Sequence, residues 1–454
     1  MQTCTQRRDS GLMPRRKPKR RINVNKLISI GFTLAAALAP GLINAETIRI
    51  AEHRQARIDA LKTVVPEIEK KYNVHIEVIE YPAPEKDFLT KLLTELRAGN
   101  APDIINAPHG SDIADMVAAG YLAPITKELK AWDGYSQLFD VGKSMVTGKD
   151  GEIYALPAML DVMELYYRRD LLEKAGISTD QPKTWAELLS RAKEIKSKTG
   201  AYGLLFPAGL TWGTGSFEEG FRLLIVGTAT PQIASDDGKL NLSGQGVKDA
   251  FGFYADLING DLMPIQPLLE PEPWVVPKYE MFPAGKLIVT TGGSWGYIYD
   301  WGSQSKSPIP NVTQVVGTWE VPGEKGGQYV LVDLNGPWAV NAKSPDVALA
   351  KKVLLELGSV KTDVAYAQNL GNIPGRVDAA ADPNFQKLTE LVPILDSLKA
   401  GAGTYLKTAE GFSAVSEGIA RATEALLRKQ TDAAGAQKIL VEYVKQVLGD
   451  DAIK

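Results

Sequence analysis

The chain has 454 residues, of which 51 are basic and 54 acidic, with a formal net charge of −3 and a single cysteine, Cys4. This length allows two domains with substantial cores. A single cysteine excludes a disulfide within the chain and a metal site built from several thiolates.

Residues 1–45 have the pattern of a cleavable export signal. Nine Lys and Arg residues precede the apolar stretch 27–42, which is short for a membrane span, and the small residue Ala45 ends the segment. We expect cleavage after about Ala45 and a periplasmic, monomeric mature protein. Removing nine basic residues and one acidic residue leaves 42 basic and 53 acidic residues, a net charge of −11, which argues against nucleic acid or anionic lipid as a partner.

From residue 47 the expected elements alternate between strand and helix. Apolar alternation predicts strands at 47–53 and 74–82 and a third strand at 104–105, with a helix in each interval. This β-α-β-α-β order is typical of a mostly parallel sheet, in which ligands bind beyond the carboxyl ends of the strands. The turns at 53–57 and 108–112 are therefore the first places to look for binding residues.

A second unit begins near Asp161 with an aromatic-rich segment. The helix that follows is expected to start at Thr184 as N-cap, with Glu187 completing a capping box. Residues 328–357 have the pattern of strand, turn, strand and helix, which fits a return of the chain to the first unit. Residues 377–454 are predicted to be largely amphipathic helix.

Residues 292–296, Gly-Gly-Ser-Trp-Gly, match the G-x-S-x-G pattern of a hydrolase nucleophile elbow. In α/β-hydrolases the catalytic order is serine, acid, histidine, whereas all three histidines of this chain precede Ser294. The residues after the turn do not form a convincing helix either. We therefore interpret Ser294 as a turn residue or minor polar contact, beside glycines that position the rings of Trp295 and Tyr297.

Other catalytic patterns are incomplete. Gly142-Lys143-Ser144 resembles the end of a phosphate loop, but Gln137 stands where the loop needs its first glycine. The scattered histidines form no zinc-binding motif, so no metal or cofactor is expected. Glu218 and Glu219 are neighbours on a helix and point in different directions, which favours a solvated face over a catalytic carboxylate pair.

Three tryptophans stand beside glycine turns: Trp212, Trp295 and Trp338. Sugars present flat C–H faces, which stack on aromatic rings, and a rim of hydroxyl groups, which bind planar polar side chains. Glycine allows the backbone to turn sharply and to approach a ligand closely. Any one of these rings is equally consistent with a core position, but their recurrence at three predicted strand ends favours a shared ligand cleft.

The sequence resembles the extracellular solute-binding proteins of sugar ABC transporters, family 1, the maltose-binding-like class. The resemblance covers essentially the whole chain after residue 45, and no single motif is decisive. It rests on five stretches in the expected order, namely residues 148–196 with "YYRRDLLEKAG" and "TWAEL", "MFPAGKLIVTTGGSWGYIYD" at 281–300, "PGEKGG" at 322–327, "SPDVALAKKVLLEL" at 344–357 and "GNIPGR" at 371–376.

This resemblance implies two α/β lobes of the periplasmic-binding-protein type, joined by crossings near residues 160, 333 and 374 around a central ligand cleft. One lobe is expected to contain 46–162 and 333–372, and the other 163–332 and 373–454. The implied function is capture of a carbohydrate, such as a di- or oligosaccharide, a sugar derivative or a polyol. Hinge closure then presents the loaded protein to the permease of an ABC importer, and no catalysis is required.

Two alternatives to a transport binding protein stay open: a periplasmic carbohydrate hydrolase, and, more weakly, a structural or adhesion protein. An anionic sugar is an alternative ligand, because His53, Arg54, Arg57, His109 and Arg376 make the predicted cleft basic.

The expected ligand contacts combine the aromatic and polar positions described above. The residues expected to bind ligand are His53, Arg54, His109, Asp112, Asp161, Met163, Trp212, Gly293, Ser294, Trp295, Tyr297, Asn335, Trp338, Asn372 and Arg376.

Overall fold

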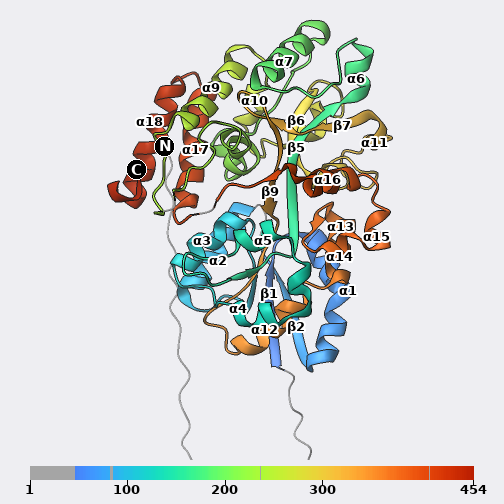
Figure 1. The fold of residues 1–454 in the computed structure, drawn as a ribbon, viewed down its shortest axis with the longest axis vertical. Helices are drawn as coiled ribbons and strands as arrows, with labels where there is room; N and C mark the ends of the chain where they lie inside the picture. The colour runs from blue at the N-terminus through green and yellow to red at the C-terminus, as the bar shows by residue number, and fades with distance from the viewer. Residues whose placement is uncertain (1–45, 82–84, 236, 408) are drawn as a thin grey trace, which may run out of the picture. The chain divides into compact units, whose positions relative to one another are not determined.

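The computed structural model describes residues 46–81, 85–235, 237–407 and 409–454, so the predicted export signal lies outside the described residues. Two β-sheets are surrounded by helices (Figure 1), which confirms the predicted α/β class. In the part of the chain that the structure describes, no helix combines the length and the apolar character needed to cross a bilayer.

The first sheet has the strand order β2-β1-β3-β10-β4. β1 pairs in parallel with β2 and β3, whereas β10 is antiparallel to β3 and β4. The parallel start predicted for residues 47–105 is therefore confirmed, and the predicted return of the chain to this sheet is β10. The strands are β1 (Glu46–Glu52), β2 (Val74–Glu80), β3 (Ile104–Asn106), β4 (Ala155–Leu156) and β10 (Trp338–Val340).

Amphipathic helices pack around the first sheet. In α1 the buried residues Ile58, Leu61, Val64 and Ile68 follow helical spacing, and the helix packs against α13. The helices of this part are α1 (Gln55–Tyr72), α2 (Glu85–Ala98), α3 (Gly110–Ala118), α4 (Thr126–Ala131), α5 (Asp140–Met145), α12 (Val347–Glu356), α13 (Val360–Leu370), α14 (Val377–Ala380) and α15 (Pro383–Gln386).

The second sheet is built around β5, which is buried along its whole length. β5 pairs in antiparallel fashion with β6, β7, β9 and β11, and β9 also pairs with β8 and β12. The strands are β5 (Met159–Arg168), β6 (Val289–Gly293), β7 (Val316–Trp319), β8 (Val321–Pro322), β9 (Gln328–Leu334), β11 (Ile373–Pro374) and β12 (Gly403–Thr404).

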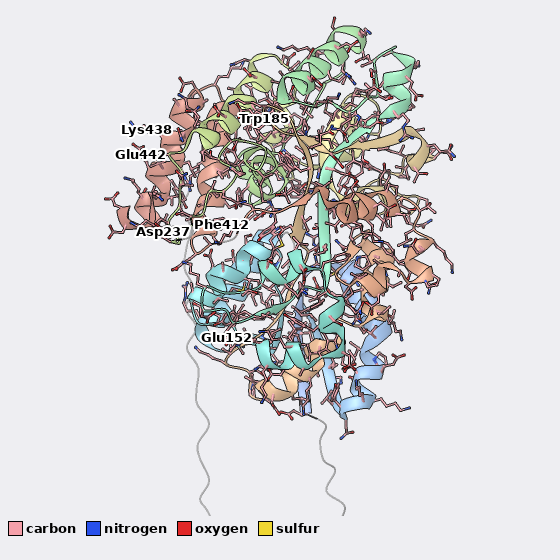
Figure 2. All side chains as sticks on the ribbon, in the orientation of Figure 1. Glu152, Trp185, Asp237, Phe412, Lys438 and Glu442 are labelled. Carbon is pink, nitrogen blue, oxygen red and sulfur yellow. The ribbon has the colours of Figure 1, made fainter. Side chains whose placement is uncertain are left out.

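Helices also surround this second sheet. The N-cap predicted at Thr184 is confirmed, but Glu187 accepts from the backbone N–H of Lys183 at 2.8 Å, so the predicted capping box is incomplete. Trp185 (Figure 2) packs on Phe253 with ring centres 5.2 Å apart. The helices are α6 (Arg169–Lys174), α7 (Trp185–Thr199), α8 (Arg222–Ile225), α9 (Gln245–Asn259), α10 (Ile265–Leu268), α11 (Val312–Val315), α16 (Val392–Ser397), α17 (Phe412–Leu427) and α18 (Ala433–Leu448).

One carboxylate connects the segments that link the two sheets. The chain passes from the first sheet to the second between β4 and β5, returns between β9 and β10, and reaches β5 again at β11. Asp161 on β5 accepts hydrogen bonds from Nδ2 of Asn335 at 2.7 Å and from Nδ2 of Asn372 at 2.5 Å. Burial raises the pKa of Asp161 to about 6, although the hydrogen bond from Asn335 opposes this shift.

A second buried carboxylate on β5, that of Glu164, makes stability depend on pH. Burial raises the pKa of Glu164 to about 8, a hydrogen bond with Thr318 opposes the shift, and the charge of Glu320 adds to it. The ordinary pKa of a glutamate is 4.5. Between these two values the folded protein holds a proton that the unfolded chain has released, so the free energy of unfolding falls as the pH rises through this window.

Replacement of Glu164 by glutamine should remove much of this pH dependence, because the glutamine side chain does not titrate. Between about pH 5.5 and about pH 8.5 the free energy of unfolding of the wild type should fall further than that of Glu164→Gln, by on the order of a few kcal/mol. The melting temperature of the wild type should therefore fall further over the same range. Glu77→Gln, at an exposed position on β2, is the matched control and should behave as the wild type. Thermal unfolding with the same pH dependence in Glu164→Gln and the wild type contradicts this assignment.

Candidate functional site

Three tryptophans gather near a buried lysine in the part of the chain that surrounds the second sheet. The ammonium of Lys278 lies 5.7 Å from the ring centre of Trp212 and 5.9 Å from that of Trp295. Trp274 meets the edge of Trp212, with ring centres 6.4 Å apart. We call Trp212, Trp274 and Trp295 the tryptophan group, and its members come from η2 (Leu210–Trp212), the residue before η4 (Val275–Met281), and η5 (Ser294–Tyr297).

Two glycines hold Trp295 in place. The Trp295 ring folds back over Gly293, where an added Cβ would lie 1.9 Å from Cζ3 of the indole. Gly371 approaches the backbone of Trp295 with a φ of +79°, and its added Cβ would lie 2.9 Å from the Trp295 Cα. A larger residue would have to move the ring of Trp295 at position 293 and its backbone at position 371. The glycine turn therefore positions Trp295, which is partly exposed.

Ser294 is a buried turn residue. Its side chain is fully buried, and among the described residues its Oγ has no hydrogen-bond partner. A nucleophilic serine needs a base within hydrogen-bond reach. Ser294 begins the short η5, whereas the serine of a nucleophile elbow is followed by a long helix. The structure gives no support to the hydrolase alternative at this position.

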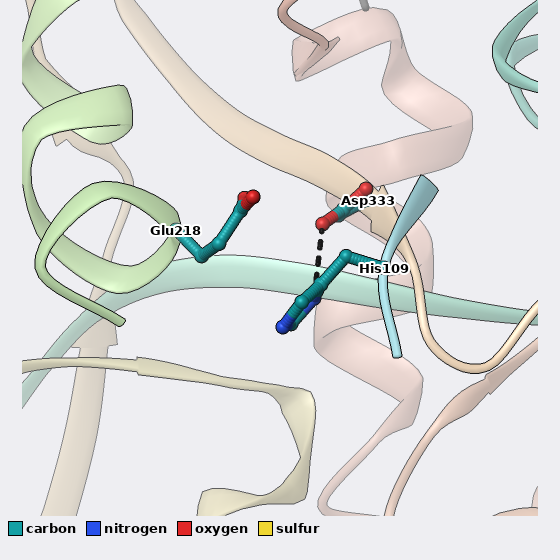
Figure 3. A group of neighbouring side chains, drawn as sticks. All are labelled: His109, Glu218 and Asp333. Carbon is teal, nitrogen blue, oxygen red and sulfur yellow. Dashed lines mark ion pairs between the residues drawn. The ribbon is translucent and has the colours of Figure 1, made fainter. Parts of the chain in front are cut away.

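A charged network joins residues from the two sheet regions. Nη1 of Arg222 lies 2.7 Å from a carboxylate oxygen of Glu218 and 2.7 Å from one of Asp333. Nδ1 of His109 lies 3.6 Å from Asp333 (Figure 3). Oγ of Ser111, on α3, donates to Glu218 at 2.8 Å. The network thus links α3 and the residue before it with β9, α8 and η3 (Ser216–Phe221).

Arg222 supplies the positive charge that faces both carboxylates of this network. Burial alone raises the pKa of Asp333, but Arg222 and His109 outweigh it and hold that pKa at about 2. His109, Glu218 and Asp333 offer atoms within 4.8 Å of one another, as metal ligands do. However, the guanidinium of Arg222 lies against both carboxylates and already supplies the cation. We therefore interpret the cluster as an ion network.

A cavity of about 170 Å³ lies beside this network. Its walls combine apolar and polar side chains from both sheet regions, including Phe412 at the start of α17 (Figure 2). Such a combination is typical of small-molecule sites. Gly213, which follows Trp212, connects the cavity wall to the tryptophan group in sequence. The other residues that line the cavity are Leu89, Leu93, His109, Ser111, Asp112, Asp115, Met116, Thr214, Glu218, Ser413, Ser416 and Glu417.

A second contact joins the walls of this cavity. Asp115 on α3 accepts hydrogen bonds from the backbone N–H of Gly411 at 2.7 Å and from the backbone N–H of Ser413 at 3.2 Å, and the hydroxyl of Ser413 also donates to it. Together with the bond between Ser111 and Glu218, these contacts hold the two walls against each other in the conformation described.

The structure brings some of the predicted site residues together. Trp212 and Trp295 both lie near the ammonium of Lys278, and Gly293 supports Trp295. His109 and Asp112 line the cavity, and Asp112 also accepts from the backbone N–H of His109 at 3.0 Å.

Three predicted ligand contacts belong to the hydrophobic core instead. Trp338 is fully buried on β10, between β3 and β4, and Met163 is 2% exposed on β5. Tyr297 packs edge-on against Tyr166, with ring centres 5.2 Å apart, and its hydroxyl donates to the carbonyl of Val316 at 3.3 Å. A ring or thioether enclosed in this way has no face for a ligand, so these three predictions are corrected.

Other predicted contacts are engaged within the protein. Asp161, Asn335 and Asn372 bind one another at the crossings, as described above. Arg376 binds both carboxylate oxygens of Asp378, at 2.9 and 2.6 Å, and lies over the ring of Trp132. These groups were predicted to hold ligand hydroxyls. In the structure they hydrogen-bond within the protein, although Oδ1 of Asn335 and Oδ1 of Asn372 have no partner among the described residues.

The basic residues of the turn 53–57 also make contacts within the protein. His53 is buried and stacks on Phe88 with ring centres 4.3 Å apart. Arg57 is fully buried, 2.5 Å from Oδ1 of Asn106 and 3.6 Å from Glu52. Arg54 is partly exposed, and its Nε lies 3.4 Å from Nε2 of His53.

Sequence reasoning missed the carboxylates of the site. Glu218 and Glu219 were expected on a solvated face, but Glu218 is buried against Arg222 and Glu219 lies 2.5 Å from Nζ of Lys278. The spacing of Glu218 and Arg222, four residues apart, is a local signal for the first pair. The second pair joins residues 59 positions apart, and no local pattern predicts it.

Comparisons with known proteins place this chain in a family. A family model for bacterial extracellular solute-binding proteins matches residues 63–393. The maltodextrin-binding protein MdxE of Bacillus subtilis is 23% identical over 412 residues, 88% of this chain and 90% of that protein. A maltooligosaccharide ABC transporter solute-binding lipoprotein of Streptococcus pneumoniae is 30% identical over 140 residues, which span 30% of this chain and 30% of that relative's length.

Solved structures share the fold. The maltose-bound MalE3 of T. maritima superimposes with a TM-score of 0.73 at 23% identity, over 89% of this chain and all of that one. An ABC transporter solute-binding protein of Thermotoga lettingae, bound with α-D-tagatose, gives 0.73 at 22% identity with the same coverage. The fold is therefore that of the periplasmic binding proteins, with two α/β lobes joined by a hinge of several crossings. With its family model matched over most of its length, the chain belongs to the bacterial extracellular solute-binding proteins.

Proposed function

We propose that this protein is the periplasmic substrate-binding component of an ABC importer and that it captures a carbohydrate by hinge closure. The observation that carries the proposal is the tryptophan group, in which glycines seat Trp295 and in which Trp212 directly precedes Gly213, a residue in the wall of a cavity lined from both sheet regions. Aromatic faces with charged hydrogen-bonding groups at their edges suit the apolar faces and hydroxyl rims of a sugar. The names of the relatives, which include maltodextrin- and maltooligosaccharide-binding proteins, support the same class.

Hinge closure would act between the predicted lobes, 46–162 with 333–372 and 163–332 with 373–454, except that α14 and α15, which pack on α13, would move with the first lobe. Sugar held by the tryptophan group and by the opposite wall favours the state in which the two walls meet. The permease in the inner membrane would then recognise this closed monomer and receive the sugar unchanged. Export through the signal in residues 1–45 would deliver the protein to the periplasm.

A neutral sugar fits the site better than an anionic one. Four of the five basic residues that favoured an anionic ligand lie beside carboxylates: His53 and Arg57 beside Glu52, His109 beside Asp333, and Arg376 beside Asp378. The cavity is lined in addition by several carboxylates, among them Asp112, Asp115 and Glu417. A ligand carboxylate or phosphate in this cavity would meet like charges.

Trp295→Ala should weaken sugar binding at least tenfold, about 1.4 kcal/mol, because the variant loses a stacking face. Isothermal titration calorimetry with maltose, mannobiose, laminaribiose and tagatose identifies the ligand and measures this loss. Trp132→Ala removes a partly buried tryptophan outside the group and is the control that should keep the wild-type affinity. Equal affinity of Trp295→Ala and the wild type argues against this site.

Gly293→Ala should weaken binding through the same ring without removing it. The new Cβ would lie 1.9 Å from Trp295, so the indole has to leave its position. Gly252→Ala on α9, where an added Cβ meets nothing within 4 Å, is the matched control and should leave affinity unchanged. Sugar titrations that give the same dissociation constant for Gly293→Ala and Gly252→Ala contradict the role assigned to the glycine turn.

A further inference from the structure

Lys278 and Glu219 form an ion pair beside the tryptophan group. Nζ of Lys278 lies 2.5 Å from Oε2 of Glu219. The same ammonium lies over the rings of Trp212 and Trp295, and a desolvated cation over an indole face is attracted to it. Trp301 fixes the backbone here, because its Nε1 donates to the carbonyl of Lys278 at 2.9 Å. The pair therefore lies next to Trp295, the partly exposed ring that we expect to contact sugar, and next to the buried ring of Trp212.

The two members of this pair differ in exposure. The side chain of Lys278 is 5% exposed, whereas that of Glu219 is 24% exposed. A second carboxylate, the buried Asp300, also interacts electrostatically with Lys278 and accepts from the hydroxyl of Tyr279 at 3.2 Å. Two carboxylates thus face one ammonium, and the more accessible group of the ion pair is negative.

We propose that the Lys278–Glu219 pair sets the charge preference of the ligand site, so that it accepts a neutral sugar and disfavours the corresponding sugar acid. This inference rests on the proposed function and adds a specificity determinant to it. A sugar hydroxyl donates to the Glu219 carboxylate in a charge-assisted hydrogen bond, whereas a ligand carboxylate meets a like charge. Lys278 does not offset this repulsion, because Glu219 and Asp300 already balance its charge.

The test compares each neutral sugar with its own acid. Maltose, mannobiose and laminaribiose are titrated beside the aldonic acids made by oxidising their reducing ends, which differ from the parent disaccharides in charge and in the opened terminal ring. The wild type should bind at least one neutral sugar and should bind its acid at least tenfold more weakly. Glu219→Gln removes the accessible carboxylate and keeps the ammonium, so the ratio of acid affinity to neutral affinity should rise at least tenfold.

Two further variants separate charge preference from structural support. Lys278→Met keeps the carboxylate, so the acid should remain the weaker ligand by at least the wild-type factor. Glu280→Gln makes the same charge change as Glu219→Gln at an exposed position on η4 and should leave the ratio unchanged. Every variant is titrated with the same acids, so the effect of the opened terminal ring on affinity cancels when variants are compared.

The outcomes are distinguishable. If Glu219→Gln and Lys278→Met weaken the neutral sugar and its acid by the same factor, the pair only supports the fold and the proposal is overturned. Where Glu219→Gln does not fold, Lys278→Met decides alone, and equal affinity for sugar and acid in that variant overturns the proposal. A wild-type protein that binds none of the six compounds refutes the sugar-binding function as well, whereas sugar binding with an unchanged ratio in Glu219→Gln refutes the specificity role only.

Discussion

The carboxylate of Asp161 holds together the three segments that connect the two sheets. Its oxygens accept hydrogen bonds from the amides of Asn335 and Asn372, so each segment is fixed to the other two. Burying a carboxylate costs free energy, and these two hydrogen bonds offset part of that cost. We infer that one lobe moves against the other by rotation about this point, because the crossings stay joined while the other interlobe contacts can separate.

Contacts across the cavity complete the hinge mechanism. The hydrogen bonds of Ser111 with Glu218 and of Asp115 with Ser413 join the walls without involving the crossing segments. They can therefore form and break as the lobes rotate. A sugar that stacked on the tryptophan group and bonded to the opposite wall, as proposed, would add its contacts to the closed state only and would shift the equilibrium toward that state.

Local patterns predicted much of the fold and one part of the site. The parallel start of the first sheet, the N-cap at Thr184 and the glycine-seated ring of Trp295 all follow from nearby residues. Trp338 has the same glycine–tryptophan pattern as Trp295, yet it lies in the core, because β10 is inserted between two other strands. Strand pairing between distant segments determines whether such a tryptophan lies in the core or in the site. Tertiary structure also brings together Glu219 and Lys278, which are distant in sequence.

Ligand-driven hinge closure is tested most directly by the distance between two spin labels, one on each lobe. The only native cysteine, Cys4, precedes the predicted cleavage point, so Arg97→Cys on α2 and Lys429→Cys after α17 supply the only thiols of the mature protein. Both positions are exposed, and neither lines the cavity. Adding the neutral sugar that binds most tightly should shorten and narrow the distance distribution. The same distribution with and without saturating sugar contradicts hinge closure.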